Sequence, residues 1–189
     1  AIHNGADDNA SGTAVMLELA RFLAQTEDPR FTRFNYRFIG FSGEELGLLG
    51  SKAFVESPIF KRDETLTMFN MDMVGRLDPV ENTLQVHGAG TSPRWATLLD
   101  SLRPPFLKIK TSESGIGPSD HTSFYLSDMP VLHFFSGTHD DYHKPSDDAH
   151  TLNYRGMTEI GNYMLRIIAH MPKQLPFSKT KAPEQGKSK

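Results

Sequence analysis

Apolar segments typical of strands alternate along this sequence with amphipathic segments typical of helices. Residues 10–25 carry apolar side chains at helical spacing, and residues 34–41 alternate aromatic with polar side chains, as a half-buried strand does. Residues 66–73 and 130–135 are apolar on both faces, which predicts buried strands. Strands that alternate with helices predict an α/β fold of three layers, with helices on both faces of a mixed, mainly parallel sheet.

Further helices are expected over residues 46–55, 93–102 and 121–126. A last helix begins after Asn153, whose side chain can cap it. Its apolar face comprises Met157, Ile160, Met164, Ile167 and Ile168. We predict one catalytic domain over residues 1–172 and a disordered tail over residues 173–189, because this lysine-rich end has few apolar side chains.

The composition limits the chemistry and the partners of this chain. It has no cysteine, so any metal ion must be held by oxygen and imidazole ligands. Its formal net charge of -3 argues against a nucleic-acid partner. The sequence has no apolar run near the ~20 residues that cross a bilayer, so we expect no membrane segment in it.

Four acidic or histidine-containing clusters follow or end apolar segments. They are Gly5–Asn9, Ser42–Glu45, Asn70–Asp72 and Tyr142–His143. Three of them lie where predicted strands finish, and ligands of open α/β sheets bind beyond the carboxyl ends of the strands. Carboxylates and imidazole are the side chains that hold zinc in the absence of cysteine. The pattern therefore predicts a metal site at one rim of the sheet.

Most of these clusters also have an ordinary structural explanation. Residues 7–9 can form a turn and a helix cap, and adjacent glutamates suit the first turn of a solvated helix. His143 lies in a polar loop of the kind found on protein surfaces. Asp72 is harder to explain in this way, because a charge in a segment expected to be buried needs a partner or a metal.

Five motifs together resemble those of the zinc aminopeptidases of the bacterial leucyl-preferring type. They are GADDNASGTA at Gly5, FSGEELGLLGS at Phe41, NMDMVG at Asn70, SDH at Ser119 and DYHKPSDD at Asp141. This family is related to glutaminyl cyclases and to the glutamate carboxypeptidase and transferrin-receptor ectodomains. The resemblance implies a zinc-exopeptidase fold, two Zn²⁺ ions in each active site, and peptide substrates with a free N-terminus. It also favours a secreted or periplasmic location, whereas the oligomeric state stays open.

The resemblance implies a set of metal ligands. Asp7 would bridge the two zinc ions, Glu45 and His143 would complete one site, and Asp72 would contribute to the other. In the family a cis peptide bond follows the bridging aspartate, which predicts a cis bond after Asp7. Family members also carry a His-x-Asp motif upstream of the first motif, and its histidine completes the second site. The residues before Gly5 contain no such motif. We therefore expect an N-terminal part to be missing and one site to be incomplete.

The resemblance also implies the catalytic groups. Glu44 would be the general base, and Tyr142 would donate its hydroxyl to the tetrahedral oxyanion. Asp8, Asp120 and His121 are expected beside the metal ligands or in the wall of the site, with Asp120 as a helix cap or a hydrogen-bond acceptor.

Three other functions remain compatible with the same motifs. A glutaminyl cyclase of this group carries tryptophan where this chain has Tyr142. A glutamate-releasing carboxypeptidase needs cations for the substrate carboxylate, and Arg76 is the one suggestive residue. A non-catalytic ectodomain has no reason to keep the acidic and histidine positions together.

Overall fold

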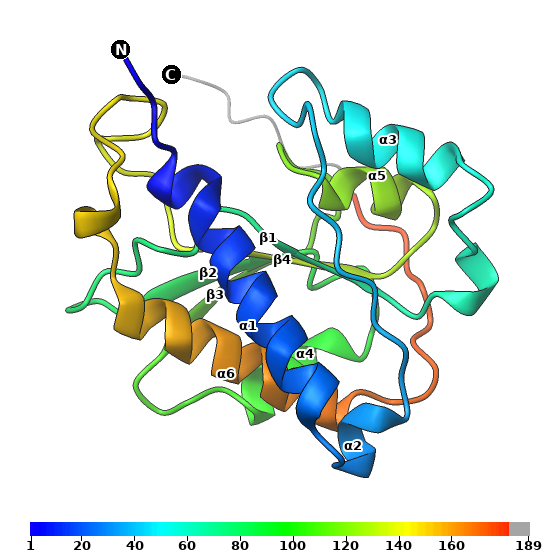
Figure 1. The fold of residues 1–189 in the computed structure, drawn as a ribbon. Helices are drawn as coiled ribbons and strands as arrows, with labels where there is room; N and C mark the ends of the chain where they lie inside the picture. Colours follow the sequence, from blue (N-terminus) through cyan, green and yellow to red (C-terminus); the bar gives the residue numbers. More distant parts are fainter. Residues whose placement is uncertain (182–189) are drawn as a thin grey trace.

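A computed structural model of the chain describes residues 1–181 and has a four-stranded sheet at its centre (Figure 1). The strands are β1 (Met68–Met71), β2 (Thr83–His87), β3 (Lys108–Ser112) and β4 (Val131–Phe135), in the spatial order β1-β4-β2-β3. β1 pairs with β4 and β2 pairs with β3 in parallel, while β2 and β4 are antiparallel. The predicted mixed, mainly parallel sheet is confirmed.

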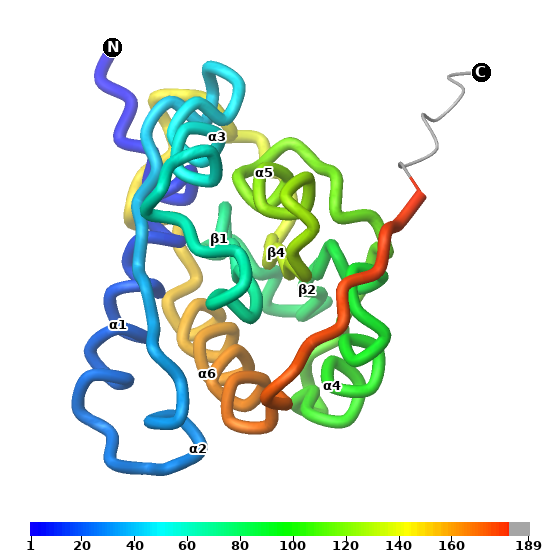
Figure 2. The backbone as a smooth tube through the Cα atoms, turned by 90° about the vertical axis from the view of Figure 1, so that its right-hand side faces the viewer, coloured from blue at the N-terminus to red at the C-terminus, as the bar shows by residue number. Residues whose placement is uncertain are grey.

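Helices cover both faces of this sheet (Figure 2). One face carries α1 (Gly12–Gln25), α4 (Trp95–Ser101) and α6 (Tyr154–His170), and the other carries α3 (Leu49–Glu56) and α5 (His121–Leu126). The shorter helical segments are η1 (Ala6–Ser11), α2 (Pro29–Thr32), η2 (Arg62–Glu64) and η3 (Ala149–Thr151). The three predicted layers are therefore present. None of the helices within residues 1–181 is long and apolar enough to cross a membrane.

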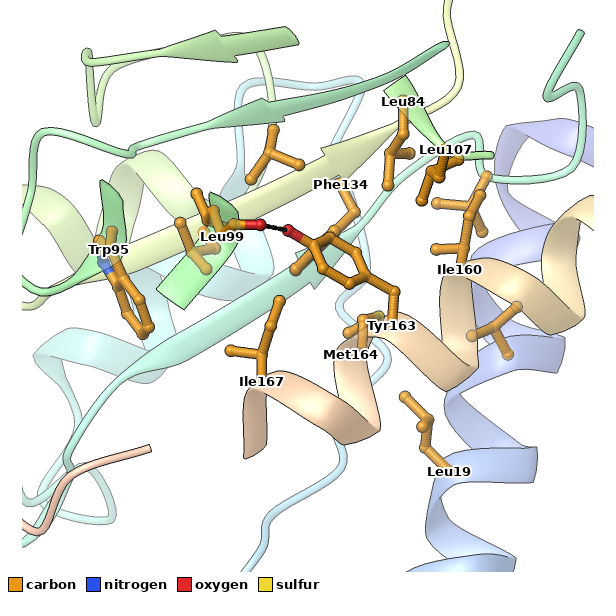
Figure 3. Close-up of a cluster of buried hydrophobic side chains, with 14 of the residues drawn as sticks. Leu19, Leu84, Trp95, Leu99, Leu107, Phe134, Ile160, Tyr163, Met164 and Ile167 are labelled. Carbon is orange, nitrogen blue, oxygen red and sulfur yellow. Dashed lines mark hydrogen bonds between the residues drawn. The ribbon is translucent and has the colours of Figure 1, made fainter. Parts of the chain in front are cut away.

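The larger core lies between the sheet and the layer of α1, α4 and α6 (Figure 3). α6 places Tyr163 in its centre, where the phenol hydroxyl donates a hydrogen bond to the Leu99 carbonyl at 2.6 Å. That carbonyl lies in the last turn of α4, where the helix itself supplies no donor. The predicted cap of α6 is confirmed, since the Asn153 side chain accepts from the Gly156 N–H at 2.8 Å.

A second core of aromatic rings supports the opposite layer. The ring of Phe41 packs against those of Phe54 and Phe124, with centroids 5.8 and 5.9 Å away. Phe54 belongs to α3 and Phe124 to α5. This packing fixes the position of Phe41, which directly precedes the Ser42–Glu45 segment that carries the two adjacent glutamates.

The strand predicted over residues 34–41 is wrong. This segment is extended, but it joins no ladder within residues 1–181. A groove of about 690 Å³, lined by residues 33–39 and Phe41 on one side and by β1 on the other, separates the segment from the sheet. The aromatic alternation is that of a strand, yet the backbone has no neighbouring strand to pair with.

The predicted tail is also wrong over residues 173–181. Leu175 is only 8% exposed, and the Ser178 N–H donates to the Thr91 carbonyl at 2.9 Å. The Thr180 N–H donates to the Tyr125 hydroxyl oxygen at 2.9 Å. This segment packs against the rest of the chain through a few apolar side chains and backbone hydrogen bonds. Residues 182–189 of the predicted tail lie outside the described residues.

Candidate active site

Segments that are far apart in the sequence meet near the carboxyl end of β1. Asp72 directly follows β1, and η1 carries Asp8. Glu44 and Glu45 lie in the turn before α3, and His143 lies in the loop that follows β4. A cleft of about 370 Å³ opens there, lined by His3, Gly5, Asp8, Glu45, His143, Lys144 and Asp147.

Asp8, Glu45 and His143 form a cluster that can hold a metal ion. Each offers one ligand atom, and these three atoms lie within 4.8 Å of one another. The Nε2 atom of His143 is 2.8 Å from Glu45 Oε1 and 2.9 Å from Asp8 Oδ2. One imidazole N–H serves a single acceptor well, so two carboxylates that converge on it suit a shared cation better. Carboxylate oxygens and an imidazole nitrogen are also ligands that zinc accepts, and a catalytic zinc site uses three protein ligands.

Asp7, which was expected to be the bridging ligand, lies outside this cluster. Its side chain is fully buried. Oδ1 accepts hydrogen bonds from the Gly75 N–H at 2.6 Å and the Ser11 hydroxyl at 3.0 Å, and Oδ2 is 3.0 Å from His139 Nε2. Both oxygens are thus engaged inside the protein.

The expected roles in this segment are wrong by one residue, and the structure assigns them one position later. Asp8, which was expected only beside the site, takes the position facing Glu45 and His143. The cis peptide bond lies between Asp8 and Asn9, one residue later than predicted. In an irregular backbone, adjacent side chains point in different directions, and the motif alone does not say which aspartate faces the cleft.

Glu44 lies beside the cluster but is not one of the three residues that offer a metal ligand. Burial raises the pKa of Glu44 to about 7, and repulsion from Asp72 and Glu45 adds to the rise. Burial, followed by the same two carboxylates, raises the pKa of Asp8 to about 6. A site that gathers this much negative charge favours a cation, and a carboxyl group with a pKa near 7 is suited to proton transfer at neutral pH.

Asp72 borders the three-residue cluster without belonging to it. Its Oδ2 accepts a hydrogen bond from the Ser119 hydroxyl at 2.7 Å, and the Asn70 amide donates to the same hydroxyl oxygen at 2.7 Å. Burial raises the pKa of Asp72. Its carboxylate is near enough to raise the pKa of Glu44 and Asp8.

The Tyr142 ring stacks on the imidazole of His143, with centroids 3.8 Å apart. Its side chain reaches the surface at the cluster, and the residue is 39% exposed. Desolvation raises the pKa of Tyr142, and the nearby carboxylates, Glu45 first among them, raise it further. The phenol therefore stays protonated at neutral pH and can donate a hydrogen bond.

Asp120 and His121 lie at the start of α5. The cap interpretation of Asp120 is wrong, because its side chain makes no capping hydrogen bond. Its charge instead raises the pKa of Glu44 and Asp72. His121 is fully buried and stacks on His133 at 4.5 Å, and burial lowers its pKa to about 3. His121 is thus a neutral packing residue outside the metal cluster.

Three residues that contact the candidate site or the segment beside it were not expected from the sequence. His139 bonds to Asp7, Ser119 bonds to Asp72, and the Asp147 carboxylate accepts from the backbone of residues 7 and 8. Ser119 lies in the recognised SDH motif, so that motif was the available signal. Nothing in the sequence distinguishes Asp147 from the neighbouring Asp148.

Comparisons with known proteins identify the family of this chain. The model of peptidase family M28 matches residues 1–168. Aminopeptidase YwaD of Bacillus subtilis (strain 168) is 30% identical over 188 residues, covering 93% of this chain and 40% of the relative. The structure of BSAP, a zinc aminopeptidase from Bacillus subtilis, aligns with a TM-score of 0.74 at 28% identity over 96% of this chain and 44% of that one.

More distant structures share the fold alone. The glutaminyl cyclase of Porphyromonas gingivalis has a TM-score of 0.66 at 18% identity, over 88% of this chain and 63% of that one. The gamma-secretase component Nicastrin has a TM-score of 0.70 at 16% identity, over 92% and 38%. The chain spans less than half the length of the two Bacillus relatives. With the family matching nearly all of the chain and a zinc-type donor set in its cleft, the chain belongs to peptidase family M28, a family of zinc metallopeptidases.

Proposed function

We propose that this chain is the catalytic domain of an aminopeptidase that uses two zinc ions to release N-terminal amino acids from peptides. The observation that carries the proposal is the convergence of Asp8, Glu45 and His143 beside the uncommitted carboxylate of Glu44. The resemblance to zinc aminopeptidases at about 30% identity supports the substrate class. Asp8, Glu45 and His143 would hold one ion, and Asp72 together with Asp8 would contribute to the second.

The proposed chemistry needs a Lewis acid and a proton carrier. A zinc ion held in the cluster would supply the Lewis acid and would make a water nucleophile available near neutral pH. Glu44 accepts the proton of the attacking water and passes it to the leaving amine. Burial is the largest cause of the raised pKa of Glu44, and a carboxyl pKa raised toward neutrality lets one group both accept the proton and return it.

The remaining groups bind the substrate. The Tyr142 hydroxyl donates a hydrogen bond to the oxyanion of the tetrahedral intermediate, a contact typically worth ~3–4 kcal/mol in acyl transfer. The carboxylates of Asp72 and Glu44 are acceptors for the protonated α-amino group of the substrate. These acceptors favour a free N-terminus over an acylated one.

One observation weighs against a glutamate-releasing carboxypeptidase. The guanidinium of Arg76 is 2.9 Å from Asp141 Oδ2, so its charge is already paired within the protein. A substrate carboxylate would have to compete with that partner. The family resemblance also argues against a glutaminyl cyclase, because those enzymes carry tryptophan where this chain has Tyr142.

The test compares three substrates in the protein that carries this chain: leucine p-nitroanilide, a glutaminyl peptide and an N-acylated glutamate. We expect zinc-dependent hydrolysis of the anilide only. Glu44→Gln should retain zinc and lose about 10²–10⁴ in kcat, because it removes the proton carrier and no metal ligand. Glu45→Gln should instead lose zinc.

The matched control is Glu56→Gln, which neutralises an exposed carboxylate at the end of α3. It should change neither zinc content nor kcat. Cyclisation of the glutaminyl peptide or release of glutamate, without anilide hydrolysis, would replace the proposal. Near-normal turnover by Glu44→Gln would remove Glu44 as the base.

A further inference from the structure

One buried carboxylate outside the candidate ligand set contacts the segment that carries Asp8. Asp147 is 2% exposed. Its Oδ2 accepts from the Asp7 N–H at 3.0 Å and from the Asp8 N–H at 3.1 Å, and its Oδ1 lies 3.0 Å from the Asp7 nitrogen. The Ala6 N–H donates to the Asp147 backbone carbonyl at 3.1 Å. Three consecutive amides of one segment thus end on a single residue 140 positions away from Asp7.

Asp147 is also close to His143 in the chain, and two consecutive turns link them. The Lys144 N–H donates to the Asp141 carbonyl at 2.9 Å, which closes a turn around His143, and the Asp147 N–H donates to the Lys144 carbonyl at 3.1 Å. Lys144 follows His143 directly in the chain. The contacts of Asp147 therefore join the turn that carries one candidate ligand, His143, to the segment that carries another, Asp8.

We propose that Asp147 is a positioning residue of the metal site, and this inference rests on the zinc-binding function proposed above. Its carboxylate holds the backbone of Asp8 against the turn of His143, so that the two ligand atoms, which are 2.9 Å apart in this structure, stay close to each other. Charge-assisted hydrogen bonds to backbone N–H groups are about twice as strong as neutral ones, which suits a contact that must keep two separate segments in register.

The alternative is that Asp147 only satisfies the free N–H groups at the start of η1. The two roles differ in what they change. A cap stabilises the fold with or without metal, whereas a positioning residue also changes the affinity for zinc after the loss of stability has been taken into account. Residues that orient metal ligands typically account for 10–100-fold in affinity.

The experiment measures the Kd for zinc, by competition with a chromophoric chelator, in the protein that carries this chain and in three variants. Asp147→Asn keeps one acceptor oxygen but turns an NH₂ group toward a backbone N–H, and Asp147→Ala removes both acceptors. We expect Kd to rise by about 10-fold in the first and toward 100-fold in the second. Asp148→Asn removes the same charge from the next residue, which is only half-buried and accepts a hydrogen bond from the Asn4 amide, and should change Kd by no more than about twofold.

Hydrogen exchange of the Asp7 and Asp8 amides in the metal-free protein provides a readout that needs no zinc. These amides should be protected in the parent and in Asp148→Asn, and exposed in Asp147→Ala. Unchanged zinc affinity in both Asp147 variants would overturn the inference, as would an equal loss in all three variants, which would indicate long-range charge. If Asp147→Ala does not fold, Asp147→Asn alone decides.

A parent protein that binds no zinc would defeat the proposed function. In that case the amide exchange still reports on the contact made by Asp147, so the two failures are distinguishable. Unprotected amides in the parent would show that the contact itself does not hold.

Discussion

Alanine substitutions of Asp7 and Asp8 should impair different properties of the protein, although the two residues are adjacent and chemically identical. Asp7 is fully buried, and its carboxylate accepts from the Gly75 N–H, the Ser11 hydroxyl and His139. Asp8 is partly exposed and faces Glu45 and His143. Asp7→Ala should therefore damage the fold, whereas Asp8→Ala should damage only the metal site.

The loss of stability in Asp7→Ala can be estimated from the hydrogen-bond donors that lose their acceptor. The Ser11 hydroxyl keeps a partner, because it also donates to the Asp7 backbone carbonyl at 2.7 Å. The Gly75 N–H and the ring of His139 lose theirs, at about 1–3 kcal/mol each. Burial raises the pKa of Asp7, so removing the buried carboxyl recovers some desolvation energy. We expect a net loss at the low end, about 2–3 kcal/mol, which lowers Tm by about 4–12 °C.

The assay is thermal unfolding with and without zinc. Zinc at 100 times its Kd adds about 2.7 kcal/mol to the stability of any form that binds it. The parent and Asp7→Ala should both rise in Tm when zinc is added, with Asp7→Ala starting lower. Asp8→Ala should start near the parent and show little rise. The reasoning is refuted if Asp8→Ala keeps the full zinc response, or if Asp7→Ala keeps the parent's Tm and loses that response.

Two further substitutions test the electrostatics and the core. The pKa of Glu44 is about 7 in the folded protein against an ordinary 4.5. Ionisation of Glu44 therefore lowers the stability of the folded protein as the pH rises from about 4.5 to about 7. Urea denaturation of the metal-free protein should show Glu44→Gln more stable than the parent at pH 8 and equal to it at pH 4, and equal curves at both would contradict the raised pKa. Tyr163→Phe should lower the unfolding free energy by about 1–3 kcal/mol, because it leaves the Leu99 carbonyl buried without a donor. Tyr154→Phe, whose hydroxyl also bonds to a carbonyl but at a 58% exposed residue, should change it by less than about 0.5 kcal/mol.

The sequence predicted the elements whose patterns are strongest. The predicted range of α5 matches the observed one, and β4 and α6 begin within a residue or two of where their apolar patterns do. β2 and β3 were missed. β3 in particular is largely exposed and carries Lys108 and Lys110, so its sequence lacks the apolar run of a buried strand. Such a strand is defined by the hydrogen bonds of its neighbour, and these come from residues distant in the sequence.

The motifs located the site but not its internal arrangement. Glu44, Glu45, Asp72 and His143 lie together as expected, because the fold brings the three segments that carry them to the carboxyl end of β1. The choice between Asp7 and Asp8 depends on which way the backbone turns at Gly5, and on a carboxylate at the other end of the chain. Pattern and spacing contain no information about that contact.

The groove beside β1 also affects how copies of this protein behave when they are crowded together. A strand edge that faces a groove offers backbone groups to any passing strand, and such edges promote aggregation. Here the edge is partly shielded. The Asn9 amide donates to the Met71 carbonyl at 2.9 Å and occupies one of its acceptors. The exposed cations Arg33, Arg37 and Lys61 line the same groove, so a second copy that paired through the same edge would bring like charges against them. These charges oppose edge-to-edge pairing of two copies, although the groove itself stays open.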